Sequence, residues 1–140
     1  MRLLIHDLEE WDFKKLFNNI DKDIMVISEE NEPNKCIGCF GCWVKTPGQC
    51  TIKDNYSNMS SLIERCAELI LISDCKYGSY SPFIKNILDR SIGYIHPYFT
   101  VRNNEMHHKS RYKKQITIRT YFYGENITEE ELEISKLLVE

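Results

Sequence analysis

The sequence predicts a parallel β-sheet with helices on both faces, and three observations support this prediction. First, short apolar runs that are typical of strands alternate with segments of helical periodicity along the chain. Second, residues 69–73 (LILIS) are continuously apolar, as in a parallel strand covered on both faces. Third, a chain of 140 residues has the length of one domain with a substantial core. We therefore expect a single three-layer α/β/α domain over residues 1–140.

Four strands are expected from the apolar runs. They are residues 3–5, 23–28, 69–73 and 115–123. β-branched residues mark the second run (DIMVIS), which indicates a buried strand. Residues 96–114 show no comparable pattern, and we expect them to form one irregular stretch of the same domain.

Four helices are expected between and after these strands. The first two are indicated by apolar residues at helical spacing, namely Phe13, Leu16, Phe17 and Ile20 in one and Met59, Leu62, Ile63 and Cys66 in the other. The third, at 81–95, is the clearest, because Ser81 is a natural N-cap and Pro82 suits the first helical position. The last helix opens with a capping box from Thr128 to Glu131.

A cysteine-rich loop at about 29–55 interrupts the alternation of strands and helices. It is longer than the usual limit of roughly 12–15 residues, so we expect a function or a ligand to order it. Four of the chain's six cysteines fall within it, and they are Cys36, Cys39, Cys42 and Cys50. The first three follow the pattern C-x2-C-x2-C, which lets one loop turn three thiolates toward a common centre.

The cysteine spacing leaves three interpretations open. Bacterial ferredoxins use C-x2-C-x2-C to hold a [4Fe–4S] cluster, and Gly38 and Gly41 would expose N–H groups to its sulfurs. Structural zinc is usually bound by two separated C-x2-C pairs, which this loop does not contain. Unmetallated thiols are the third interpretation. The spacing favours the cluster, with Cys66 expected to be a buried packing residue and Cys75 ambiguous.

Composition and charge exclude several classes of protein. The net charge of −3 argues against nucleic-acid binding, which usually requires a positive excess. No stretch approaches the ~18 apolar residues of a membrane span, and the N-terminal residues 1–11 lack the apolar core of a signal peptide. We therefore expect a cytoplasmic protein, in which clustered thiols are more often a metal or redox site than a disulfide framework.

Two segments make the chain similar to a known family. They are residues 36–55 (CIGCFGCWVKTPGQCTIKDN) and 69–90 (LILISDCKYGSYSPFIKNILDR), and the similarity extends over about 23–123. The family is that of the NADPH-dependent FMN reductases, and the cysteine loop resembles that of the iron–sulfur flavoproteins within it. The resemblance implies a flavodoxin-like fold, with a five-stranded parallel sheet in the order 2-1-3-4-5 and FMN at the carboxyl ends of the strands.

The resemblance also implies an activity and a set of contacts. The activity would be hydride or electron transfer through FMN, with NAD(P)H, a cluster or a redox partner protein as the electron source. The protein would then be an NAD(P)H-dependent oxidoreductase that forms dimers or tetramers. The loop that contacts the flavin ring in the family corresponds here to Cys75, Lys76, Tyr77, Gly78, Ser79 and Tyr80. Both tyrosines of this loop are candidates for stacking on a flavin, and packing residues are the alternative.

The chain departs from the family pattern in three places. Residues 6–12 (HDLEEWD) replace the glycine-, serine- and threonine-rich turn that holds the FMN phosphate, and their carboxylates would repel it. The chain ends in the helix after the fourth strand, so we expect a shortened flavodoxin-like sheet without the fifth strand. Cys75 stands where the family usually has proline.

A basic stretch at 102–114 is a second candidate anion site. It contains five Lys and Arg residues, a single acid, Glu105, and the neighbouring His107 and His108. A solvated loop is the alternative interpretation, and contact with a partner subunit or cofactor is another.

Two functional hypotheses follow from these observations. The first is a small redox protein that carries FMN, a [4Fe–4S] cluster or both. The second is a cofactor-poor binding subunit that keeps the fold and pairs with itself or with a full-length relative. An intermediate form of the first hypothesis keeps the cluster and lacks the flavin, and it would be an electron-transfer module.

Overall fold

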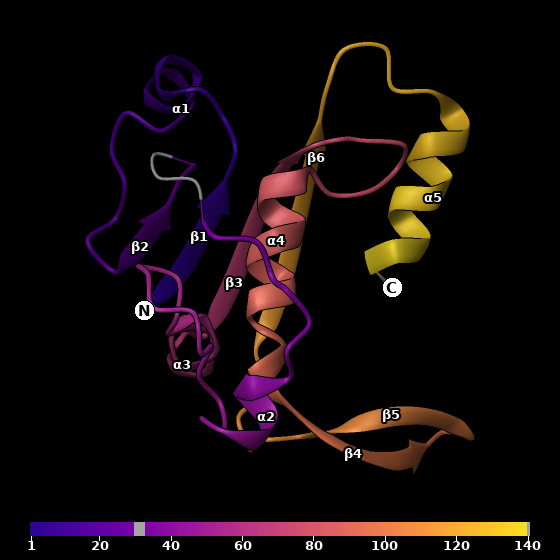
Figure 1. Cartoon of the computed structure of the whole chain (residues 1–140). Coiled ribbons are helices and arrows are strands. Elements are labelled where there is room, and N and C mark those ends of the chain that lie inside the picture. Colours follow the sequence, from indigo (N-terminus) through magenta and orange to yellow (C-terminus); the bar gives the residue numbers. More distant parts are fainter. Residues whose placement is uncertain (30–32, 140) are drawn as a thin grey trace.

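Four parallel strands form the central sheet of the computed structural model, which describes residues 1–29 and 33–139 (Figure 1). Their order is β2 (Ile24–Ile27), β1 (Arg2–His6), β3 (Glu68–Asp74) and β6 (Thr117–Tyr123). This is the flavodoxin-like order 2-1-3-4, with β6 as the fourth strand and no fifth strand among the described residues. The shortened three-layer α/β/α fold predicted from the sequence is thereby confirmed.

One face of the sheet carries the hydrophobic core. Two helices, α3 (Met59–Arg65) and α4 (Pro82–Arg90), pack on this face, and a 3-10 turn, η1 (Ile92–Tyr94), follows α4. The sheet contributes odd-numbered residues, because successive side chains of a strand point to opposite faces. The main buried side chains of this core are Leu3, Ile5, Met59, Ile63, Cys66, Leu69, Leu71, Phe83, Ile84 and Ile87. Cys66 is fully buried, as expected.

The opposite face is covered less completely than the sequence predicted. Among residues 1–29 and 33–139, the helix on this face is α1 (Glu10–Leu16), with the Phe13 ring stacked on His6 at a centroid distance of 4.0 Å. Ile70 and Ile72 of β3 are half-buried and line a groove of about 520 Å³. The expectation that β3 is fully covered on both faces is therefore wrong. The first helix is also shorter than expected, since α1 ends at Leu16.

Both predicted helix caps are present. The Ser81 hydroxyl accepts a hydrogen bond from the Ile84 backbone N–H, at the start of α4. The capping box of α5 (Glu129–Val139) is closed by reciprocal hydrogen bonds between Thr128 and Glu131. Figure 1 shows α5 standing apart from the sheet, beside the loop that follows β3.

Residues 96–114, expected to be irregular, contain a β-hairpin instead. Strands β4 (Ile95–Arg102) and β5 (Glu105–Ser110) pair antiparallel and project from the α/β body (Figure 1). Asn103 and Asn104 form the turn, both with positive φ angles, of 52° and 64°. Asparagine tolerates this left-handed conformation, which two-residue hairpin turns require. The Asn-Asn pair was therefore the missed signal.

None of the helices formed by the described residues has the length and apolar composition needed to cross a bilayer.

Candidate functional site

The four cysteines of the loop surround one small cavity. It has a volume of about 100 Å³, and its lining includes Cys36, Cys39, Cys42 and Cys50. The loop is more structured than the sequence suggested, because a single helical turn, α2 (Gly41–Val44), forms inside it. Residues 30–32, which belong to the predicted loop, lie outside the described residues. The prediction that the four thiols turn toward one metal centre stays a prediction.

Trp43 fastens α2 to the body of the protein. Its indole N–H donates hydrogen bonds to the carbonyl oxygens of Ile92 and Ile95, at 3.2 and 3.0 Å. Gly41 is required by close packing, because a Cβ atom there would collide with the methyl group of Thr51. The Thr51 hydroxyl in turn lies 3.4 Å from the Cys39 sulfur. These contacts hold the two halves of the loop against each other.

The thiols differ in their electrostatic environment. Hydrogen bonds from Thr51 and from the Gly41 N–H lower the pKa of Cys39, and nearby Lys45 adds a smaller effect in the same direction. Burial raises the pKa of Cys42, and the neighbouring Cys50 adds to the increase. Cys39 is exposed and Cys42 is buried. The loop therefore presents a thiol with a lowered pKa at its surface and one with a raised pKa inside.

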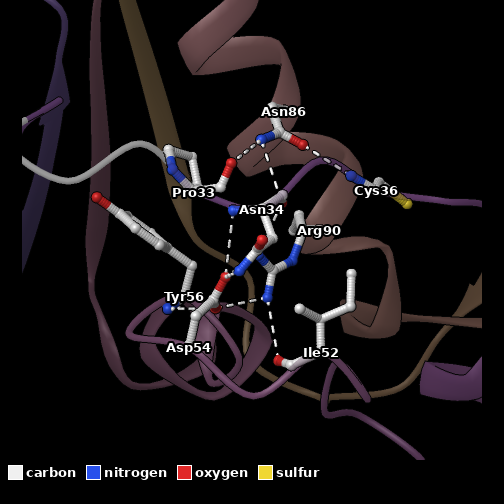
Figure 2. Close-up of polar contacts among 8 residues, drawn as sticks. All are labelled: Pro33, Asn34, Cys36, Ile52, Asp54, Tyr56, Asn86 and Arg90. Carbon is white, nitrogen blue, oxygen red and sulfur yellow. Dashed lines mark hydrogen bonds and ion pairs between the residues drawn. The ribbon is translucent and has the colours of Figure 1, made fainter.

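A buried arginine from α4 ties together the two ends of the loop. The Arg90 guanidinium forms a bidentate ion pair with Asp54, with N···O distances of 2.6 and 2.7 Å (Figure 2). It also donates to the carbonyl oxygens of Asn34, before the cysteines, and Ile52, after them. The Arg90 side chain is completely buried, so this ion pair is shielded from solvent.

Asn86, one helical turn before Arg90, supplies a second anchor. Its side-chain oxygen accepts a hydrogen bond from the Cys36 backbone N–H, and its NH₂ group donates to the Pro33 carbonyl (Figure 2). Positions four apart lie on the same face of a helix. One face of α4 therefore holds the cysteine loop through protein contacts, in addition to any ligand the loop binds.

Arg90 also contributes charge to the cavity. It lines the cavity together with the cysteines, and its Nε makes no hydrogen bond to any described nitrogen or oxygen atom. The hydrogen bond with Asp54 is the main cause that raises the pKa of Arg90, and Cys50 adds to this effect. Arg90 therefore brings to the cavity lining a buried positive charge that is paired with Asp54 and hydrogen-bonded to Cys50.

The thiols line the cavity without forming a closed metal site. Across residues 1–29 and 33–139, no three His, Cys, Asp or Glu side chains are already placed to hold one metal ion. Cys36 and Cys39 lie on the exposed side of the loop.

The predicted flavin loop forms a tight turn at the other end of α4. Lys76 and Ser79 pair across the turn, and its central residues Tyr77 and Gly78 both have positive φ. Tyr77 is 87% exposed at the tip. Gly78 lies directly under α5, where a Cβ atom would come within 2.7 Å of Ile134. The backbone of this loop is therefore covered by the C-terminal helix.

The remaining residues of this loop contact the sheet. The Tyr80 hydroxyl lies 3.2 Å from the Thr120 hydroxyl, and the Tyr80 ring packs on Phe122 at 5.2 Å. Cys75 extends the ladder of β3 and β6 by donating its N–H to the Tyr123 carbonyl. Of the two tyrosines, Tyr80 packs on the sheet and is half-buried, whereas Tyr77 is exposed.

A protein carboxylate occupies the place where strand ends would receive a phosphate. Asp7, directly after β1, accepts hydrogen bonds from the Asp74 backbone N–H at 3.0 and 3.1 Å. It also accepts one from the Tyr123 hydroxyl at 3.0 Å. The pocket beside it is lined by further acids, Glu9, Glu10 and Glu29. The residues present at this site do not fit the phosphate of FMN.

The structure keeps the two predicted sites apart. The cysteine cavity lies at the C-terminal end of α4, beside Asp89 and Arg90, whereas the loop 75–80 precedes its first residue. A helix of 9 residues is about 14 Å long at about 1.5 Å per residue. The sequence placed both sites in one protein but gave no information on their separation.

The sequence analysis missed the anchors of the loop, although a signal was present. Arg90 follows Ile87 by three positions and Phe83 by seven, so it lies on the apolar face of the helix. A charged residue on a buried face requires an opposite charge, and Asp54 supplies it.

The chain was compared with protein-family models, curated proteins and solved structures. No family model, no curated protein and no solved structure matches the chain.

The anchoring of the loop generates a prediction about stability. Replacing Asp54 with Asn leaves the Arg90 charge buried and unpaired, and we expect a loss of about 3–5 kcal/mol in the free energy of unfolding at pH 7. The ion pair lowers the pKa of Asp54, so its stabilisation is complete above the unfolded value of about 4 and is lost as the pH falls below it. Urea unfolding at pH 7 and pH 3 measures both effects.

The matched control is Asp21→Asn. Asp21 also pairs with an arginine, Arg2, but 73% of its side chain is exposed, so the loss should be within about 1 kcal/mol. Equal losses for the two variants would contradict the anchoring role of Asp54.

Proposed function

We propose that this protein is a small electron-transfer protein that holds a [4Fe–4S] cluster on Cys36, Cys39, Cys42 and Cys50. The observation that supports this function best is the one cavity whose lining includes all four cysteines and the buried Arg90. Four cysteine thiolates are the usual ligands of such a cluster. The bound cluster would supply reversible one-electron oxidation and reduction.

The surrounding residues would tune and expose this centre. The positive charge of Arg90 favours the reduced, more negative state, and the N–H of Gly41 and the hydroxyl of Thr51 are donors to the Cys39 sulfur. Both effects raise the reduction potential. Cys36 and Cys39 are exposed, so a centre bound to them would have an edge near the surface, where another redox centre could approach.

FMN and NAD(P)H are not part of this proposal. The carboxylate of Asp7 already takes the donors at the strand ends, and α5 covers the backbone of Gly78. We therefore propose the form of the redox hypothesis that keeps the cluster and lacks the flavin. All six cysteines are free thiols, which agrees with our proposal of a reducing, cytoplasmic location.

Substitution of one ligand tests the cluster directly. We expect wild-type protein purified without oxygen to be brown and to contain about four iron and four sulfide per chain. Cys39→Ser should lose most of this iron, because serine replaces one of the four thiolates. Cys75→Ser, outside the cavity, should retain it. Unchanged iron in the Cys39 variant would refute the ligand assignment.

Flavin binding tests the acidic loop. We expect FMN to bind no more tightly than riboflavin, because the phosphate meets Asp7, Glu9 and Glu10. Fluorescence titration of both flavins measures the ratio. In Glu9→Gln/Glu10→Gln protein, FMN should gain affinity over riboflavin. Stoichiometric FMN binding by the wild type, much tighter than riboflavin binding, would show that the phosphate has a site elsewhere.

A second candidate function is that of a binding subunit that pairs with a second copy of this chain. Two observations favour it: the open groove on the α1 face of the sheet, and the apolar side chains that α5 leaves exposed. Leu137 of α5 is 73% exposed and Tyr121 beside the groove is 53% exposed. Two unpartnered apolar surfaces on one chain can cover each other between copies.

Sedimentation tests this pairing. A dimer is expected at micromolar concentration, and Leu137→Glu should dissociate it, since the new charge would be buried in the contact. Glu133→Gln, on the same helix, is the control. A wild-type monomer would leave electron transfer as the only proposed function.

A further inference from the structure

The β4–β5 hairpin presents an apolar face to solvent. Phe99 pairs with His108 and Val101 with Met106, and directly opposed residues of two antiparallel strands point to the same side. Residues two apart in a strand also share a side, so all four side chains lie on one face. Phe99, Val101 and Met106 are 58%, 68% and 72% exposed. A two-stranded hairpin gains little stability from such exposure, so this face is suited to binding.

The apolar face continues into the cysteine loop. Ring contacts connect Phe99 to His108 at 4.6 Å, His108 to Trp43 at 5.5 Å, and Trp43 to Phe40 at 5.3 Å. Phe40 stands between two of the proposed cluster ligands, and it is 55% exposed. A molecule bound to the hairpin face would therefore also cover the exposed edge of the cysteine cavity.

The hairpin is basic, although the chain as a whole is acidic. Residues 95–114 carry five of the chain's 18 Lys and Arg residues and only one of its 21 Asp and Glu residues. Arg102 and Lys109 are exposed and form no ion pair within the part of the chain that the structure describes. Lys45, on the cysteine loop, is likewise exposed and unpaired there. Because successive side chains of a strand alternate, Arg102 and Lys109 lie on the opposite face of the thin hairpin from Phe99 and Val101. They therefore add positive charge close behind the apolar face, and Lys45 adds it on the cysteine loop.

We propose that this face, which we call the hairpin face (Phe40, Trp43, Phe99, Val101, Met106, His108), docks a small acidic electron-carrier protein. The proposal rests on the proposed function, because it names the partner of the cluster. The apolar centre would be desolvated on contact, and Lys45, Arg102 and Lys109 would attract the partner's carboxylates. Complexes of this kind are typically small and short-lived, so the interface should bury less than roughly 1,200 Å².

Charge argues against a second copy as the occupant of the hairpin face. A two-fold contact through this face would bring two positively charged hairpins, and Lys45 of both copies, close to each other. Like charges across an interface are unfavourable. The candidate pairing through the sheet groove uses a different surface and does not compete with this one.

Binding to two carriers of opposite charge tests the proposal. The probes are a bacterial-type ferredoxin, which is acidic, and cytochrome c, which is basic. Titration into ¹⁵N-labelled protein at low ionic strength should shift the amide resonances of 36–45 and 96–110 with ferredoxin and leave them unchanged with cytochrome c. Lys45→Gln/Arg102→Gln/Lys109→Gln should weaken ferredoxin binding about tenfold and flatten its salt dependence.

A charge-matched variant provides the control. Lys15→Gln/Lys22→Gln/Lys136→Gln removes three exposed cations outside the hairpin and the cysteine loop and should leave the affinity unchanged. All six positions are exposed, so both variants should fold, which circular dichroism would verify. Equal affinity of the two triple variants for ferredoxin, or a wild-type dimer formed through 96–110, would overturn the proposal.

The outcomes separate docking from the proposed function. Iron and sulfide are assayed on the same sample, and binding is measured whether or not a cluster is present. Ferredoxin binding to iron-free protein would support the hairpin face while refuting the cluster. Iron-loaded protein whose hairpin resonances do not respond to ferredoxin would refute the hairpin face alone. In loaded protein, electron transfer followed by stopped flow should slow by the same factor as binding weakens in the basic triple variant.

Discussion

The ion pair between Arg90 and Asp54 is the interaction on which the organisation of this protein depends. A long loop without regular structure loses much conformational entropy when it is ordered, and a covering of apolar residues is not available to offset that loss here. The Arg90 guanidinium offsets this loss of entropy with hydrogen bonds to both ends of the loop. It belongs to a helix that is itself fixed in the core. The four thiols are gathered as a consequence, and the same arginine places a positive charge beside them.

A second constraint acts at the carboxyl ends of the strands. In a flavodoxin-like sheet these ends offer backbone donors to an anionic ligand, and here the chain supplies its own anion in Asp7. The Tyr123 hydroxyl donates a hydrogen bond to the same carboxylate. The pKa of Tyr123 is raised, chiefly by burial. The strand ends that would recognise a flavin phosphate therefore already hold a protein carboxylate, whereas the cysteine cavity is lined by the positively charged Arg90. The structure therefore opposes the flavin-binding part of the family resemblance and leaves the cysteine-loop part open.

The sequence was sufficient for the fold because its signals were local and agreed with one another. Apolar runs, the Ser81 cap and the Thr128–Glu131 box each predicted an element that the structure contains. Pairing between Arg90 and Asp54 joins positions 36 residues apart, and no local pattern gives its partner. The hairpin turn at Asn103 and Asn104 was missed because its flanking strands lack clean alternation. The sequence analysis did not predict that one face of β3 is only partly covered. The apolar composition of a strand does not determine the length of the helix that packs on it, and here α1 is short.

The distribution of charge connects the fold to its proposed use. The acids of the first loop and of α5 lie on the α/β body, and the basic residues of 102–114 lie on or next to a projecting ribbon. This separation gives the molecule a positive end, at the exposed edge of the cysteine cavity. Long-range attraction would orient an acidic partner toward that end before contact. A uniformly acidic surface would repel the same partner. The basic stretch is therefore better understood as the part of the surface that determines where an electron can enter or leave.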